Sequence, residues 1–193
     1  MRCFPVRWKV RIDPFVYPLW AFMLLAVPFR VLCGWLGAAV CHEMGHILAQ
    51  CILGGRGGKV IIRPMGAVIE GEDLGRYKNI ISVLAGPVVG AVPMVLLSSY
   101  PEMALCSFIL TAYNLIPLYP LDGGRVLHLM SEKSGAMRIV VAGVEAAVMT
   151  GIVCIASWYH TPVPLLPVVP YLREKYLAKR GNSGYNRATI EMR

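Results

Sequence analysis

The stretch CHEMGH, residues 41–46, lies within the apolar segment RVLCGWLGAAVCHEMGHILAQCILGG, residues 30–55. Apart from Arg30 at its start, the segment holds one charged residue, Glu43. A transmembrane helix needs about 20 largely apolar residues, and the run from 31 to 53 meets that length. The segment therefore predicts a membrane-spanning helix, and its polar centre raises the question of which chemistry needs such a setting.

The residue types and spacing of HEMGH are those of a metal-binding helix. Residues four apart lie on one helix face, about 6 Å apart along the axis, so His42 and His46 can chelate one zinc ion. Glu43 stands beside them and can act as a general base toward a water molecule. The alternative is a helix whose two histidines are satisfied in a core. Ionisable groups at bilayer depth are costly, about 2.5–3.5 kcal/mol each on insertion scales, and this favours the metal site.

The composition agrees with a membrane protein. Of the 193 residues, 56% are hydrophobic and 16% are charged, against about 25% charged in soluble domains. The net charge of +8 is concentrated near the two ends of the chain rather than along one face, so a nucleic-acid-binding protein is not expected. The six cysteines are scattered and form no C-x-x-C pair, which argues against a disulfide framework or a cysteine zinc site.

Hydropathy predicts about six transmembrane segments in an all-α polytopic membrane protein: 14–29, 31–53, 80–100, 103–121, 139–159 and 161–172. The fourth is broken by two prolines. The sixth is short and carries four, so an irregular span and a re-entrant segment both stay open. Between the second and third, KVIIRPMGAVIEG (59–71) predicts two short strands, a small membrane-associated β-hairpin.

Lysine and arginine counts assign an orientation to these segments. From the N-terminus to the C-terminus, the successive loops and ends hold four, one, five, none, three, none and six. The alternation follows the positive-inside rule through six crossings and predicts both termini in the cytoplasm.

A third metal ligand is expected outside the HEMGH helix. Catalytic zinc usually has three protein ligands, and ILAQCILGG (47–55) offers no His, Asp or Glu. The candidate is Asp122 in NLIPLYPLDGGRVL (114–127), where prolines and glycines break an apolar segment as they do around cavities at membrane depth. The alternative role for Asp122 is the N-cap of the helix that follows.

Two other ionisable residues lie in apolar surroundings. Glu145 falls inside the fifth span, where a structural pair within the helix bundle is favoured over a gate or proton-path role. His128 is interpreted as a surface histidine rather than a fourth metal ligand.

The two motifs HEMGH and NLIPLYPLDGG, in this order, resemble those of the site-2 protease family of intramembrane zinc metalloproteases. DPFVYPLW (13–20), RPMGAVIE (63–70) and LAGPVVG (84–90) add to the resemblance, which covers about residues 12–135 and is strongest to the sporulation-type members that process a sigma-factor precursor. The C-terminal nucleotide-sensing domain usual in that type is not expected here.

The resemblance implies a role for each motif residue. His42, His46 and Asp122 match the ligands of one catalytic Zn²⁺, Glu43 matches the catalytic glutamate, and Asn114 matches a substrate-contacting asparagine. It implies a three-helix catalytic core (31–53, 80–100 and 103–121) and a hairpin that pairs with an unwound substrate. The chain is expected to be a single integral membrane protease domain, 1–193, with a core at about 31–131 and a basic cytoplasmic tail at 173–193.

The expected function is zinc-dependent hydrolysis of a peptide bond in a membrane-tethered protein, in or near the cytoplasmic leaflet. The substrate is a sigma-factor precursor or another regulatory protein, and inhibitory membrane proteins are expected as partners. The expected location is the bacterial cytoplasmic membrane or the membrane around the forespore. Two rival functions stay open: a non-catalytic zinc-binding membrane scaffold, and a metal-ion transporter, although no repeat supports the latter. The sequence leaves the substrate and the oligomeric state open.

Overall fold

The computed structural model describes residues 7–63, 66–96, 100–132 and 134–160, together with Val168 and Leu172. The chain divides into two compact units, Met1–Ile116 and Pro117–Arg193. Apart from Val168 and Leu172, the predicted sixth span at 161–172 and the predicted tail at 173–193 lie outside the described residues.

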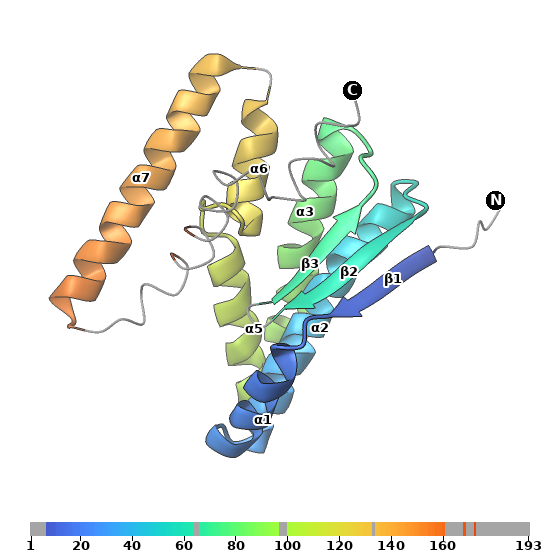
Figure 1. Ribbon diagram of the computed structural model, residues 1–193, viewed down its shortest axis with the longest axis vertical. Helices are drawn as coiled ribbons and strands as arrows, with labels where there is room; N and C mark the ends of the chain where they lie inside the picture. The colour runs from blue at the N-terminus through green and yellow to red at the C-terminus, as the bar shows by residue number, and fades with distance from the viewer. Residues whose placement is uncertain are drawn as a thin grey trace. The chain divides into compact units, whose positions relative to one another are not determined.

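The first unit combines a small sheet with five helices, and Figure 1 shows how they are arranged. In chain order these are β1 (Arg7–Ile12), α1 (Val16–Ala26), α2 (Phe29–Ile52), β2 (Gly57–Arg63), β3 (Gly66–Gly71), α3 (Arg76–Gly90), α4 (Val92–Leu96) and α5 (Pro101–Asn114).

The ends of α2 and α3 follow from local chemistry. The backbone N–H of Gly55 donates to the Gln50 carbonyl at 2.8 Å, and Gly54 has φ of 101°, a conformation that glycine adopts without strain. This closes α2 after Ile52. Before α3, Asp73 Oδ1 accepts hydrogen bonds from the Gly75 N–H at 2.9 Å and from Asn79 Nδ2 at 2.6 Å, so the turn is fixed and α3 starts at Arg76.

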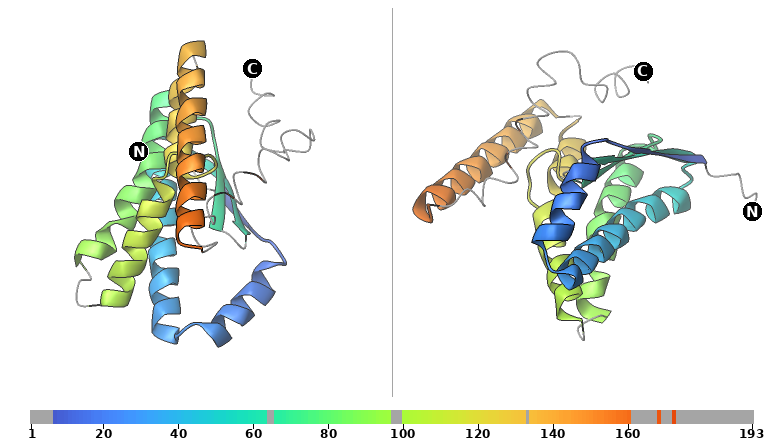
Figure 2. Two further views of the ribbon diagram at one scale, coloured as in Figure 1. Left: turned by 90° about the vertical axis from the view of Figure 1, so that its left-hand side faces the viewer. Right: turned by 60° about the horizontal axis from the view of Figure 1, so that its bottom comes forward.

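Helices α2, α3 and α5 lie side by side (Figure 2), and they approach each other closely at glycines. A Cβ on Gly34 would lie 3.2 Å from the Glu102 backbone of α5, and one on Gly45 would meet the Ala85 carbonyl of α3. Small residues at such positions allow membrane helices to pack backbone against backbone. This three-helix bundle holds the HEMGH motif at its centre.

The sheet has three strands in the order β1-β2-β3. Strands β2 and β3 form the predicted hairpin, with Gly58 opposite Gly71 and Ile62 opposite Ala67 in an antiparallel register. The basic N-terminal segment, for which no strand was predicted, adds β1 in parallel to β2, with Val10 opposite Val60. The hairpin is therefore part of a larger, mixed sheet.

The second unit contains α6 (Asp122–Ser131) and α7 (Gly135–Trp158). Ser134 caps α7, because its side chain accepts a hydrogen bond from the Met137 N–H at 3.3 Å. Leu118, fully buried, packs in the segment that leads to α6, and the Leu121 N–H donates to its carbonyl at 2.9 Å.

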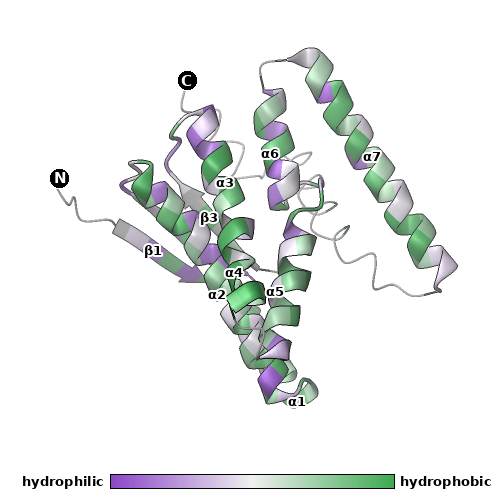
Figure 3. Ribbon diagram, turned by 180° about the vertical axis from the view of Figure 1, so that it is seen from behind, coloured by the Kyte–Doolittle hydropathy of each residue, from purple (hydrophilic) through white to green (hydrophobic). Residues whose placement is uncertain are grey.

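Three helical stretches among the described residues are long and apolar enough to cross a membrane: Phe29–Ile52, Arg76–Leu96 and Gly135–Trp158. Most residues along these stretches are apolar, as Figure 3 shows most clearly for α7. Large apolar side chains such as Ile139 and Trp158 are exposed, which suits a lipid environment rather than water. The chain is a mostly helical membrane protein with a small sheet, as predicted. Helices α1 and α5 are shorter, at 11 and 14 residues, because prolines and turns end them early.

Candidate metal centre

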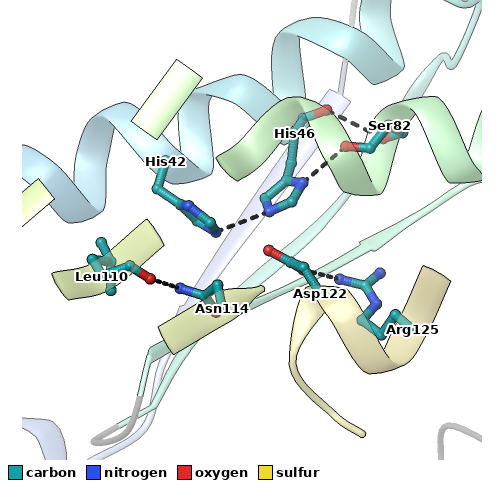
Figure 4. A network of polar contacts seen from close by, with 7 residues as sticks. All are labelled: His42, His46, Ser82, Leu110, Asn114, Asp122 and Arg125. Atoms are coloured by element: carbon teal, nitrogen blue, oxygen red, sulfur yellow. Dashed lines mark hydrogen bonds and ion pairs between the residues drawn. The ribbon is translucent and has the colours of Figure 1, made fainter. Parts of the chain in front are cut away.

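His42 and His46 project from the same face of α2, and both are buried, at 3% and 5% exposure. Their Nε2 atoms lie 3.2 Å apart, and their rings meet nearly edge to face, with an interplanar angle of 81° (Figure 4). Two imidazole nitrogens at about 2.0–2.1 Å from one tetrahedral zinc ion would be about 3.3–3.4 Å apart. The separation of the two nitrogens therefore fits a shared Zn²⁺.

Helix α3 fixes the protonation of His46. The Nδ1 of His46 lies 2.9 Å from the Ser82 carbonyl oxygen, and a carbonyl can only accept, so Nδ1 carries the proton (Figure 4). In the neutral ring, Nε2 then has the free lone pair, which is the form that binds a metal. The Ser82 hydroxyl also donates to the His46 carbonyl at 3.5 Å, a weaker contact that ties the same two helices together.

Two glycines of α3 make room for the histidines. A Cβ on Gly86 would overlap Nε2 and Cε1 of His46, and one on Gly90 would lie 3.1 Å from His42 Nδ1. Sequence reasoning missed Ser82, Gly86 and Gly90 as parts of the site. The small-residue spacing of Gly86 and Gly90 was the available signal, because glycines four apart mark a close helix contact in membranes.

Glu43 is half-buried on α2, directly after His42. Asn114 ends α5, and its Nδ2 donates to the Leu110 carbonyl of its own helix at 3.0 Å (Figure 4). The general-base role of Glu43 and the substrate contact of Asn114 stay predictions.

In the second unit, Asp122 is buried at 5% exposure and is the first residue of α6. Its Oδ1 lies 3.4 Å from Arg125 Nη1, one turn along the helix (Figure 4). The N-cap is Leu121, so the alternative capping role for Asp122 is not what the structure shows. A buried carboxylate needs a compensating cation. The role of Asp122 as the third metal ligand remains a prediction.

A second polar cluster within this unit joins Glu145 of α7 to the segment before α6. Glu145 Oε1 accepts from His128 Nε2 at 3.0 Å and from the Tyr119 N–H at 3.3 Å. The Tyr119 and His128 rings meet at 5.3 Å between centroids. Glu145 thus forms the structural pair favoured from the sequence, and His128 is its partner. A cavity of about 410 Å³ adjoins the pair, lined by His128, Ser131, Glu132, Arg138, Val141, Ala142 and Glu145.

Comparison with known proteins matches residues 78–158 to Peptidase family M50. A zinc metalloprotease of Methanocaldococcus jannaschii is 28% identical over 116 residues, covering 52% of this chain and 34% of the relative. Stage IV sporulation protein FB of Bacillus subtilis is 24% identical over 139 residues, covering 65% of this chain and 48% of the relative. The chain thus spans less than half the length of either relative.

The fold is also that of a solved structure. The site-2 protease from Methanocaldococcus jannaschii superposes with a TM-score of 0.63 and 17% identity, covering 89% of this chain and 90% of the other. At that identity the likeness shows a shared fold. The family match and the two relatives show that this chain is similar to peptidase family M50, the family of the site-2 proteases.

Proposed function

We propose that this chain is a zinc-dependent intramembrane endopeptidase that hydrolyses a peptide bond of a membrane-tethered protein. The observation that carries the proposal is the convergence of two buried Nε2 atoms at 3.2 Å, one of them held in the metal-binding tautomer by the Ser82 carbonyl. The similarity to a family of metalloproteases supports a catalytic metal as the function of this histidine pair.

In this proposal His42, His46 and Asp122 hold one zinc ion. All three are buried and offer the nitrogen and oxygen donors that zinc accepts. When bound, zinc supplies Lewis acidity, which polarises a carbonyl and makes water more acidic. Glu43 takes the proton from the attacking water and passes it to the leaving amine, and Asn114 holds the substrate near the site. The two compact units act together as one protease domain.

The substrate is a regulatory protein anchored in the same membrane and cut in or near the cytoplasmic leaflet. The similarity to a sporulation protein supports a role in sporulation with a sigma-factor precursor as substrate, and inhibitory membrane proteins are proposed partners. Alternating lysine and arginine counts support a multi-pass bacterial protein with both termini in the cytoplasm. In that orientation α2 enters from the outside, so its second half, with the HEMGH motif, lies nearer the cytoplasm.

The test is cleavage of candidate membrane-tethered substrates on co-expression with the wild type or with Glu43→Gln. The substitution removes the base but keeps the size of the side chain, so cleavage should fall at least about 100-fold while zinc content is unchanged. Glu72→Gln, which changes an exposed carboxylate in the loop after β3, should cleave normally. Undiminished cleavage by Glu43→Gln would contradict the proposed mechanism.

The same preparation separates the two rival functions. A scaffold would bind zinc and cleave none of the substrates, whether or not Glu43 is present. A transporter would carry zinc into sealed vesicles, and uptake that depends on His42 and His46 would favour it over the protease.

A further inference from the structure

Helix α5 buries two hydroxyl groups beside the histidine helix. Ser107 is fully buried and Thr111 is half-buried, and because they are four residues apart they share one face. Neither hydroxyl oxygen is exposed, and neither has a hydrogen-bond partner among the described residues. A buried hydroxyl without a partner costs free energy, so these two groups require an explanation.

The usual explanation for a hydroxyl in a membrane helix does not apply to them. Serine and threonine commonly donate to a carbonyl of the preceding turn. In this chain Thr150 does so, with Oγ1 at 2.9 Å from the Ala146 carbonyl, and Ser131 donates to the His128 carbonyl at 2.8 Å. Thr111 makes no such bond, so its hydroxyl is available for a group on a neighbouring helix.

That neighbouring group is the His42 ring. A Cβ placed on Gly90 would lie 3.1 Å from His42 Nδ1 and 3.4 Å from Thr111 Oγ1, so both atoms border the space next to this glycine. Helices α2 and α5 also pack closely, because a Cβ on Gly34 of α2 would lie 3.2 Å from the Glu102 backbone of α5.

The chemistry of the ring then defines what Thr111 does. His42 Nε2 faces His46, so a metal-binding His42 carries its proton on Nδ1, the atom on the Gly90 side. Metal-binding histidines are held in that form by an acceptor for the other N–H, as His46 is held by Ser82. We propose that Thr111 is a positioning residue whose hydroxyl accepts the hydrogen bond of the His42 Nδ1–H through one bridging water molecule, since the hydroxyl has no direct partner among the described residues.

This inference rests on the proposed metal-binding role of His42, and it adds a residue from a third helix to that site. Ser82 of α3 orients His46, and Thr111 of α5 orients His42. The two ligands of α2 are thus each set by a different neighbour in the bundle.

The test measures zinc affinity of the full-length protein in detergent by competition with a chromophoric chelator. Thr111→Val keeps the size and branching of the side chain but removes the hydroxyl. We expect its Kd for zinc to rise about 10-fold or more, the usual effect of losing such a partner. Thr111→Ser restores the hydroxyl and should recover most of the affinity. Thr150→Val, which removes a hydroxyl that bonds only to its own helix, should bind like the wild type.

The possible outcomes distinguish a failure of this inference from a failure of the proposed metal site. If the wild type binds zinc no more tightly than His42→Ala, the proposed metal site fails. If the wild type binds tightly and Thr111→Val binds equally well, the role of Thr111 alone is overturned. Loss of affinity in Thr111→Ser to the level of Thr111→Val would also overturn it, because the effect would then come from packing rather than from the hydroxyl.

Discussion

Gly86 of α3 lies directly against the imidazole of His46, on the edge that includes Nε2. Any Cβ at this position would occupy the space of the ring atoms that face His42. The hydrogen bond from His46 to the Ser82 carbonyl, one turn earlier on the same helix, holds the ring in place from the other side. Helix α3 thus sets the position of a histidine that it does not carry.

We expect Gly86→Ala to disrupt zinc binding. In a helix interior this change normally stabilises by up to about 1 kcal/mol, but here the methyl group must displace the ring. Zinc affinity, measured by chelator competition, should fall at least about 10-fold, by analogy with the loss of a partner that orients a ligand. Gly143→Ala in helix α7 is the matched control, because a Cβ on Gly143 would have no neighbouring atom within 4 Å. Equal affinities of the two variants would contradict the assignment of Gly86.

A second prediction concerns Glu145, which accepts hydrogen bonds from His128 and from the Tyr119 backbone. Glu145→Ala removes the acceptor for two donors, and should lower the free energy of unfolding by about 1–3 kcal/mol. Glu145→Gln retains one side-chain oxygen as an acceptor, so its free energy of unfolding should fall by less than that of Glu145→Ala. Thermal unfolding in detergent compares the variants, and hydrogen exchange at the Tyr119 amide should accelerate most in Glu145→Ala. An unchanged exchange rate in Glu145→Ala would show that the hydrogen bond from the Tyr119 N–H to Glu145 does not hold the segment before α6 in place.

The sequence predicted the elements whose signal is local. The apolar run at 31–53 became α2 at Phe29–Ile52, and the two short strands formed as β2 and β3. Strand β1 was missed, because its pairing with β2 joins segments about 50 residues apart and leaves no local pattern. Its alternation of basic and apolar residues is equally typical of a charged flank.

The site shows the same division between local and distant information. The spacing of His42 and His46 predicted that they share a face, and their Nε2 atoms do meet. Ser82 was not predictable, because it acts through its backbone carbonyl, and any residue type has one. Thr111 was not predictable either, since only the packing of α5 on α2 reveals which atom its hydroxyl borders.

Removal of the metal gives a third prediction. Chelator treatment should abolish cleavage, and added Zn²⁺ should restore it. Asp122→Asn replaces a buried carboxylate by a neutral amide of the same size, which is a poorer zinc ligand, so zinc affinity should fall. Asp73→Asn changes an exposed carboxylate that caps the turn before α3 and should leave zinc affinity unchanged. If Asp122→Asn binds zinc as the wild type does, the third ligand is a different residue.

The last prediction concerns the orientation of the chain, which decides the leaflet in which cleavage occurs. Residues 54–78, which include β2, β3 and the start of α3, carry five Lys and Arg residues, whereas the turn before α5 carries none. The segment 54–78 should therefore face the cytoplasm. With all six native cysteines replaced, single cysteines at Asp73 and Tyr100, both exposed, report the two sides. In intact cells a membrane-impermeant maleimide should label Tyr100→Cys, and it should label Asp73→Cys only after permeabilisation. The reverse pattern would place the HEMGH half of α2 near the outer leaflet, and the proposed cytoplasmic-side cleavage would then be wrong.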